Sequence, residues 1–408
     1  MTTLETAPAK TRTTARVADF VAFVADKETE RVLKSFVLEQ AMPHAFIAIG
    51  GVDDAIEYLG KVERSPQFLM IDLHDSNMPL SDLGRLSQVC EPSVQVVTIG
   101  ERNDVGLFRS LLKLGIRDYL VKPVTVELLI RTVNVSEGRV SDVNGSRVGK
   151  MIGFTGSRGG VGVTTLALNL ARHLANETHR RIAYVDLDLY SGAAASMLGL
   201  KSNNGLADVL QNMHRLDPQY VERTLVSSSN RLYLLSSEID YDDKKPFAAG
   251  ALKRVLQILC NSFHYVIVDI GRSQDALAEE AYDQASRMYL VTDHTVHSTR
   301  QAMRLLRHIE GRDNNPQTSI ILNNPTSVTG GKVDSADMIA AIGRPVIHEV
   351  QFETKLLAMA ENLGEAPKAT GKGANTFRYA ITRIANDLTG QRDEPESGLL
   401  KKFRLRRG

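Results

Sequence analysis

The chain has 408 residues, which is longer than one ordinary domain, so we expect two domains. Hydrophobic residues make up 43% of the chain and supply two cores, while a net charge of +1 argues against a protein that coats nucleic acid. The two cysteines, Cys90 and Cys260, lack metal-ligand spacing, which predicts reduced thiols in a cytoplasmic protein.

The first 15 residues are rich in threonine and contain no apolar segment. This composition predicts a disordered lead and not a signal peptide. No run in the sequence approaches the roughly 20 apolar residues of a membrane span. We therefore expect any membrane contact to be made from the cytoplasmic side.

Residues 16–135 alternate between strand-like and helix-like apolar patterns. We expect strands at residues 20–24, 45–48, 68–71, 94–99 and 118–121. We expect helices at residues 29–40, 52–59, 81–90, 105–114 and 126–133. Five strand–helix units of this length predict an α/β domain with a doubly wound, flavodoxin-like parallel sheet.

Polar residues follow several of these strands, at the edge where such sheets bind ligands. They are Asp26, Asp72, Thr98 and Lys122. This set resembles a response-regulator receiver domain. The resemblance implies that Asp72 is the phosphoacceptor, that Asp26 holds Mg²⁺, that Thr98 senses the phosphoryl group and that Lys122 bridges to it.

The receiver pattern has two departures. Ala25 stands where receivers carry a second acid, and three extra residues separate Asp72 from Met78. Fewer carboxylates bind Mg²⁺ less well, because hard cations need several oxygen ligands. The residues favour a pseudo-receiver used for dimerisation or partner docking, and they leave open phosphorylation of Asp72 or a fold with neither role.

Residues 136–149 are polar, contain glycines and lack periodicity, so they predict a linker to a second domain at residues 150–390. That domain opens with a short apolar strand at residues 151–154, and apolar residues recur at helical spacing over 166–175. The glycine-rich stretch between them predicts an anion site, because its N–H groups and the helix N-terminus point at one spot. A purely structural strand-to-helix turn is the alternative.

The glycine-rich stretch resembles the deviant P-loop of the MinD/ParA ATPases, Lys-Gly-Gly-x-Gly-Lys-Thr-Thr. The resemblance predicts a second doubly wound domain that binds ATP and Mg²⁺ and dimerises around the nucleotide. Arg158 occupies the first lysine position, whose side chain reaches across the dimer, and Val163 replaces the second lysine. The predicted nucleotide-binding residues are Arg158, Gly159, Gly160, Val161, Gly162, Val163, Thr164 and Thr165, and Thr164 also faces Mg²⁺.

Two further strands end in carboxylates. Residues 181–188 end in Asp186 and Asp188, which would lie on one face of a strand, and residues 264–269 end in Asp269. The resemblance to the MinD/ParA ATPases implies that Asp186 and Asp269 lie near Mg²⁺ and that Asp188 orients the attacking water. The alternative for the first pair is two solvated turn acids.

The base-binding end matches the family less closely. Asn323 follows a predicted strand at residues 318–322 and resembles the family asparagine that reads the adenine edge. Phe352 lies in a loop that resembles the base-binding loop, although Gln351 replaces the usual proline.

The missing lysine bears on mechanism. A charge-assisted hydrogen bond contributes about 1.5–3 kcal/mol, so its loss weakens ATP binding by about 10- to 150-fold. Loss of one group that stabilises developing charge slows the chemical step by about 10²–10³-fold. The sequence therefore predicts an ATP binder with slow or no turnover, in which Arg158 partly replaces the lysine.

The chain ends in a polar spacer and a basic tail, residues 391–408. On a helix, Leu399, Leu400 and Phe403 share one face while Lys401 and Lys402 lie on the flanks, which is typical of an interfacial membrane anchor. The tail resembles the membrane-targeting segment of MinD-type proteins. A solvated basic tail and a nucleic-acid contact are the alternatives.

The combination of the two domains resembles the TadZ/CpaE family of Flp (tight-adherence) pilus assembly proteins. The resemblance implies a dimeric localisation factor at the inner membrane and the cell pole, with the pilus secretion ATPase, other pilus components and a polar landmark protein as partners. A turnover-competent positioning ATPase for another cargo and a phosphorelay output protein are the rival hypotheses.

Overall fold

The computed structural model describes residues 18–62, 64–74, 76–134, 148–243, 247–271, 275–324, 333–351, 353–367 and 372–391. The chain divides into two compact units, Met1–Ser146 and Arg147–Gly408, and the division falls within the segment predicted as a linker. The predicted N-terminal lead and the tail residues Leu399, Leu400, Lys401, Lys402 and Phe403 lie outside the described residues.

The N-terminal unit is built on a five-stranded parallel sheet with the order β2-β1-β3-β4-β5. Its strands are β1 (Phe20–Val24), β2 (Ala45–Ile49), β3 (Phe68–Asp72), β4 (Gln95–Gly100) and β5 (Asp118–Val121). Its helices are α1 (Lys27–Glu39), α2 (Val52–Lys61), α3 (Pro79–Val89), α4 (Val105–Lys113) and α5 (Val126–Asn134). This is the flavodoxin-like order, so the predicted fold class is confirmed.

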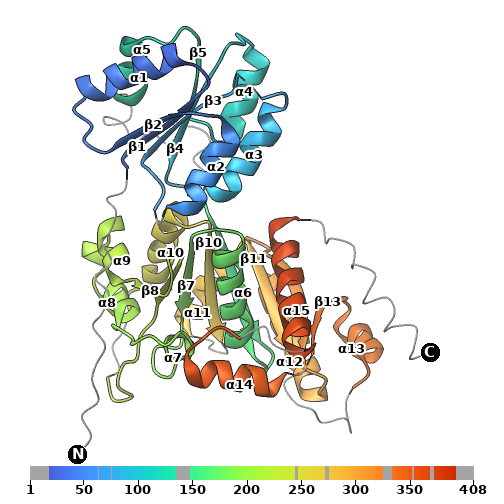
Figure 1. Cartoon of the computed structure of the whole chain (residues 1–408). Coiled ribbons are helices and arrows are strands. Elements are labelled where there is room, and N and C mark those ends of the chain that lie inside the picture. The colour runs from blue at the N-terminus through green and yellow to red at the C-terminus, as the bar shows by residue number, and fades with distance from the viewer. Residues whose placement is uncertain are drawn as a thin grey trace, which may run out of the picture. The chain divides into compact units, whose positions relative to one another are not determined.

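Helices cover both faces of this sheet (Figure 1). Leu33 and Leu129, from α1 and α5, pack on one face, while Leu59 and Leu83, from α2 and α3, pack on the other. Because β1, β3 and β4 are buried on both faces, they read in the sequence as largely apolar runs. That is why their positions were predictable from the sequence.

The C-terminal unit is built on an eight-stranded sheet with the order β13-β12-β11-β6-β10-β7-β9-β8, in which only β8 is antiparallel to its neighbour. Its strands are β6 (Lys150–Gly156), β7 (Ile182–Asp186), β8 (Val226–Ser227), β9 (Leu232–Leu235), β10 (Tyr265–Gly271), β11 (Arg287–Thr292), β12 (Gln317–Asn323) and β13 (Val346–Val350). Its helices are α6 (Val163–Glu177), α7 (Ala194–Met197), α8 (Gly205–Gln211), α9 (Pro218–Thr224), α10 (Ala251–Ser262), α11 (Ala276–Gln284), α12 (Val296–Glu310), α13 (Ser335–Ile342), α14 (Thr354–Leu363) and α15 (Lys372–Thr389), with a short 3₁₀ turn at Met213–Arg215.

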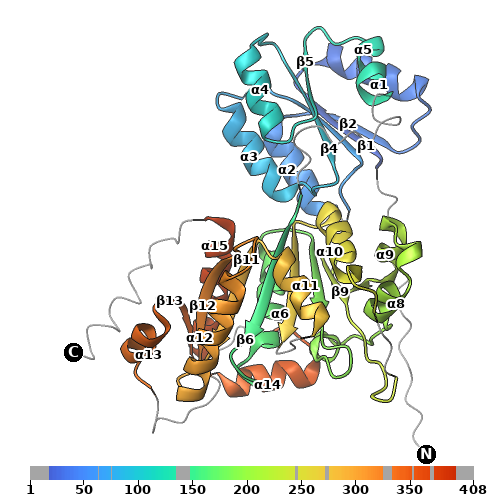
Figure 2. The same cartoon turned by 180° about the vertical axis from the view of Figure 1, so that it is seen from behind.

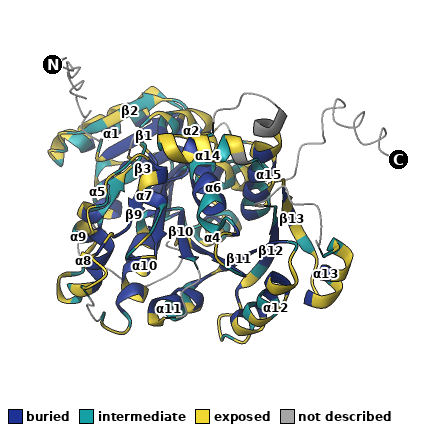
Figure 3. Ribbon diagram, turned by 90° about the horizontal axis from the view of Figure 1, so that it is seen from below, coloured by how far each residue is buried: buried dark blue, intermediate teal, exposed yellow. Residues whose placement is uncertain are grey.

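Two helical layers enclose this sheet. Helices α6 and α15 lie on the face turned toward the viewer in Figure 1, and α10, α11 and α12 lie on the face seen in Figure 2. The strands β10, β11 and β12 are buried between the layers, while much of α13 is exposed (Figure 3). Helix α6 is buried along most of its length because it packs on the sheet and also against α15.

Strand β6 holds the topological switch point of the C-terminal sheet. Strand β7 lies on one side of β6 and β11 lies on the other, so the connections leave the centre of the sheet in opposite directions. Ligands of doubly wound sheets bind at such points, beyond the carboxyl ends of the strands. Among the described helices, none is both long enough and apolar enough to cross a membrane.

Candidate functional site

The glycine-rich loop connects the end of β6 to the first residue of α6. Gly160 and Gly162 have φ angles of 76° and 90°, in the left-handed region that favours glycine. A Cβ atom at Gly162 would lie 2.4 Å from Nδ2 of Asn323, so a larger residue would clash there. The loop therefore delivers the N-terminus of a 15-residue helix to the switch point, which is suited to bind an anion.

Asp269 is anchored on β10 beside the loop. Its carboxylate accepts hydrogen bonds from the Tyr184 hydroxyl at 3.0 Å and from the Gly271 amide at 3.0 Å. Burial raises the pKa of Asp269, although contacts with the hydroxyls of Thr164 and Tyr184 oppose the shift. The structure thus brings the predicted metal-site residues Thr164 and Asp269 together.

Asp186 is the register partner of Asp269 on the neighbouring strand β7. Its carboxylate accepts from the backbone amides of Asp188 at 3.1 Å and Ala194 at 3.2 Å. Burial, together with the charge of Asp269, raises the pKa of Asp186 to about 7. A Cβ atom at Gly192 would lie 2.5 Å from Oδ2 of Asp186, so the following loop closes tightly over this carboxylate.

Asp188 does not share a strand face with Asp186, because β7 ends at Asp186. Asp188 is exposed, and its carboxylate accepts from the backbone amides of Tyr190 (3.2 Å) and Ser191 (2.9 Å) and from the Ser191 hydroxyl (2.9 Å). The structure corrects the expectation that both carboxylates project from one strand. Asp188 fixes its own turn next to the site.

These residues fit a magnesium ion. Two nearly fully buried carboxylates face each other on adjacent strands, and a hydroxyl at the start of α6 lies beside one of them. Oxygen ligands of this kind suit Mg²⁺, which takes its remaining ligands from nucleotide phosphates and water. Thr164, Asp186 and Asp269 would hold the ion, which would supply positive charge to the phosphates.

Val163 provides no cation for the phosphates. Its Cγ2 atom would lie 2.7 Å from a Cβ atom at Gly156, so the side chain packs over the end of β6. It also contacts the apolar core beneath α6. The cradle therefore keeps the backbone geometry of a phosphate site without the second lysine.

Arg158 is tied to Asp293 in the same chain. Its Nε atom donates to Oδ2 of Asp293 at 2.9 Å, its Nη2 atom donates to the same oxygen, and Nη1 donates to the Gly159 carbonyl at 3.1 Å. Burial opposes ionisation of Asp293, but hydroxyl groups and Arg158 outweigh it and lower the pKa of Asp293. The positive charge of Arg158 is balanced within its own chain.

Asn323 lies at the end of β12 and touches the loop directly. Its Nδ2 atom donates to the Val161 carbonyl at 2.7 Å, which ties β12 to the phosphate cradle. Its role in reading adenine stays a prediction. Phe352, the other residue predicted at the base, lies outside the described part of the chain.

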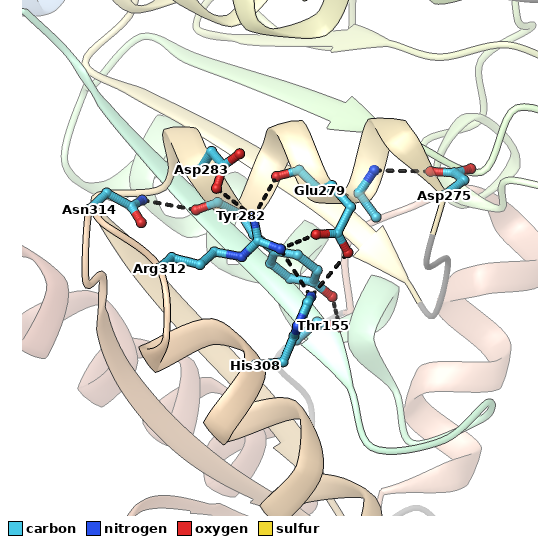
Figure 4. A network of polar contacts seen from close by, with 9 residues as sticks. Thr155, Asp275, Glu279, Tyr282, Asp283, His308, Arg312 and Asn314 are labelled. Atoms are coloured by element: carbon cyan, nitrogen blue, oxygen red, sulfur yellow. Dashed lines mark hydrogen bonds and ion pairs between the residues drawn. The ribbon is translucent and has the colours of Figure 1, made fainter. Parts of the chain in front are cut away.

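A polar network behind the cradle connects β6 to helices α11 and α12 (Figure 4). The Thr155 hydroxyl donates to the Gly271 carbonyl at 3.0 Å and lies 3.2 Å from the Tyr282 hydroxyl. Arg312 stacks over the Tyr282 ring at 5.3 Å and forms ion pairs with Glu279 and Asp283. Helix α11 is therefore fixed to the strand that carries the phosphate loop.

The receiver-like residues form a second polar site in the N-terminal unit. Nζ of Lys122 lies 2.6 Å from a carboxylate oxygen of Asp26 and 2.6 Å from one of Asp72. Asp72 is buried and also accepts from the backbone amides of Ala25 and His74. Lys122 thus bridges both acids.

Asp26 caps helix α1 and is held as a carboxylate. Burial opposes ionisation, but hydrogen bonds from Lys122 and Thr29 outweigh it and lower the pKa of Asp26 to about 2. A cavity of about 500 Å³ opens beside the pair. It is lined by Ala25, Asp26, Glu28, Thr29, Val32, His74, Glu101, Lys122, Pro123 and Val124.

Thr98 lies one residue further from the end of its strand than predicted. Strand β4 continues to Gly100, so Thr98 lies inside the strand, where it is buried, and its hydroxyl donates to the Asp118 carbonyl at 3.4 Å. An apolar run does not mark where strand pairing stops, which is why the predicted strand ended one residue short of Gly100.

Tyr184 and Asp293 belong to the site and were not predicted. Tyr184 is fully buried and donates to Asp269, whereas Asp293 follows the last residue of β11. The rule that ligands bind beyond the carboxyl ends of strands could have identified Asp293, because it follows a largely apolar run at residues 288–292. No comparable signal marks a tyrosine inside an apolar strand.

Comparison with known proteins agrees with this geometry. Residues 149–320 match a family described as an AAA domain. The septum site-determining protein MinD of Bacillus subtilis (strain 168) is 24% identical over 268 residues, which cover 63% of this chain and 97% of that protein. The solved MinD of Pyrococcus horikoshii OT3, complexed with Mg-ADP, has a TM-score of 0.51 at 18% identity and covers 60% of this chain and 99% of its own.

The pilus assembly protein CpaE from Caulobacter crescentus CB15 is 30% identical over 29% of this chain and 97% of its own, with a TM-score of 0.27. The C-terminal unit therefore has the fold of the MinD/ParA P-loop ATPases and is similar to them in sequence.

Proposed function

We propose that this protein is an ATP-binding, dimeric localisation and assembly factor for a Flp/Tad-type pilus secretion system, which it places at the cell pole. Nucleotide and Mg²⁺ bind at the glycine-rich loop and hold two copies together. Turnover is slow or absent, so the nucleotide serves to assemble the dimer and not to drive a cycle.

One observation carries this proposal: the phosphate cradle and the acid pair keep their arrangement while Val163 stands where a lysine is expected. Backbone amides, a helix N-terminus and a magnesium site remain for ground-state binding. The chemical step suffers more, because stabilisation of developing charge is the larger contribution of such a cation.

The pilus role rests on the domain order and on the altered P-loop, which resemble TadZ/CpaE. The ion pairs of Lys122 support a receiver-like unit that docks or dimerises, since the Asp72 carboxylate is buried and already paired. The proposed partners are the pilus secretion ATPase, other pilus components and a polar landmark protein. The proposed membrane contact is the basic tail on the inner-membrane surface.

Calorimetry and sedimentation of the full-length protein test the nucleotide role. We expect Mg·ATP to bind with a dissociation constant in roughly the micromolar-to-millimolar range and to convert monomer to dimer. Phosphate release should stay at the level of the blank. A protein that shows no binding and stays monomeric in saturating Mg·ATP would overturn the proposal.

Microscopy of the source cell tests the pilus role. A fluorescent fusion of the full chain should form a focus at a pole, and deletion of the protein should remove surface pili. Removing residues 391–408 should release the fusion from the membrane. Normal pili after deletion would favour a positioning role for another cargo. A phosphorelay protein would be favoured if the wild type carries an acyl-phosphate label that Asp72→Asn loses, and if the protein does not bind ATP.

A further inference from the structure

The ion pair between Arg158 and Asp293 occupies the edge of the guanidinium that is formed by Nε and Nη2. Both Nε and Nη2 of Arg158 point at one oxygen of Asp293, and Nη1 contacts the Gly159 carbonyl. A bidentate contact with a phosphate uses two such N–H groups. Arg158 therefore cannot offer this edge of its guanidinium to a phosphate while it remains on Asp293.

Asp293 is built to keep Arg158 in place. The Asp293 residue is only 4% exposed, and its second oxygen accepts from the Thr295 hydroxyl at 2.8 Å. Thr295 in turn caps α12 through the backbone amide of Ser298 at 3.2 Å. Removing the cation would leave a buried carboxylate without its charged partner, which is strongly unfavourable.

Asp293 also lies beside the loop. Strand β11 pairs with β6 up to Val291 and Gly156, and the Ser157 amide donates to the Val291 carbonyl at 2.9 Å. The carboxylate and a nucleotide phosphate would thus compete for one guanidinium over a short distance. Val163 leaves the cradle without a lysine, so the outcome of that competition decides whether a loop side chain contributes positive charge.

We propose that Asp293 is an internal competitor of the nucleotide phosphates for Arg158, and that ATP must displace this carboxylate before Arg158 can offer its Nε/Nη2 edge to a phosphate. The inference rests on the proposed nucleotide function and adds the residue that regulates affinity at that site. It applies to a phosphate bound in the same chain or in a second copy.

Substitution of Asp293→Asn tests the competition in the full-length protein. Asparagine keeps the shape and can still accept from Thr295, but it removes the charge that holds Arg158. We expect Mg·ATP to bind about 10-fold more tightly, because one charge-assisted contact is gained. The gain should disappear in the double variant Arg158→Ala/Asp293→Asn.

Asp387→Asn is the matched control. Asp387 lies on α15, where it pairs with Arg287 of β11 and contacts His348 of β13. This variant removes one carboxylate from an arginine without touching the loop, so its ATP affinity should equal that of the wild type. Thermal unfolding verifies that each variant is folded, and Asp293→Ser carries the same expectation if Asp293→Asn does not fold.

The outcomes separate the two proposals. If the wild type binds ATP and folded Asp293→Asn binds it with the same affinity, only the competition is overturned. A gain in ATP affinity that persists in Arg158→Ala/Asp293→Asn would also overturn the competition alone. Absence of binding in both proteins would overturn the competition together with the nucleotide function. Binding by Asp293→Asn alone would support the competition and contradict ATP binding by the wild type.

The dependence of the affinity gain on protein concentration shows whether Arg158 contacts the nucleotide of its own chain or that of a second copy. A gain already present at concentrations at which the protein is monomeric assigns Arg158 to the nucleotide of its own chain. A gain that appears only as dimers form assigns it to the nucleotide of a second copy.

Discussion

Asp186 and Asp269 face each other across neighbouring parallel strands, and each residue is at most 3% exposed. Backbone amides and the Tyr184 hydroxyl donate to them. Two like charges at this depth cannot both ionise easily, so burial and mutual repulsion raise the pKa of both carboxyl groups when no cation is bound.

The first prediction concerns the pH dependence of stability without Mg²⁺. The pKa of Asp186 is about 7 in the folded chain and close to 3.8 when unfolded, so the folded state binds more protons between these values. The free energy of unfolding should therefore fall as pH rises from about 4 to 7, by on the order of 4 kcal/mol from this group.

Chemical unfolding across this pH range measures the effect. Asp186→Asn should flatten the curve, and exposed Asp240→Asn should leave it unchanged. Millimolar Mg²⁺ with nucleotide should restore stability above pH 7, because the ion replaces the proton between the carboxylates. An identical slope in Asp186→Asn and in the wild type would contradict the burial argument.

The second prediction restores the missing lysine. Val163→Lys places an ammonium group at the first residue of α6, and we expect Mg·ATP to bind about 10- to 150-fold more tightly. Val148→Lys adds the same charge before the opposite end of β6 and should change nothing. Equal affinities for Val163→Lys and the wild type in calorimetry would show that the cradle does not bind phosphates.

The third prediction concerns turnover. The Asp188 carboxylate accepts from the amides of Tyr190 and Ser191 and from the Ser191 hydroxyl, and we expect these contacts to keep it from orienting an attacking water. Phosphate release should be at blank level in the wild type and unchanged in Asp188→Ala. The rival, a turnover-competent ATPase, would be supported if the wild type releases phosphate, Asp188→Ala abolishes this release and Ser191→Ala preserves it.

The fourth prediction concerns the receiver-like unit. Lys122→Met leaves the buried carboxylate of Asp72 next to Asp26 without a cation, and we expect a loss of about 3 kcal/mol in the unfolding free energy of this unit. Lys113→Met, at an exposed position near the end of α4, should have little effect.

The effect of Lys122→Met should depend on pH. Because the pKa of Asp26 is lowered to about 2, the stabilisation from its ionised form is complete above about pH 4 and is lost as pH falls toward 2. The difference between Lys122→Met and the wild type should therefore shrink in acid. A difference that grows in acid would contradict the ion-pair account.

The sequence by itself determined the elements and the kind of chemistry. Apolar runs and helical periodicity located the strands and helices of the N-terminal unit to within a few residues, because both patterns are local properties of the chain. The glycine-rich loop and the acids after strands predicted a phosphate site and a metal site for the same reason. The ends of strands were less certain, as Thr98 and Asp188 illustrate.

Only the tertiary structure decided which charges meet. The order of strands puts Asp186 opposite Asp269, places Lys122 between Asp26 and Asp72, and gives Arg158 the partner Asp293. These contacts join residues far apart in the chain, and their energies depend on burial, which no local pattern reports. The sequence named the groups of the site, but the packing of the sheet determined their partners and their protonation.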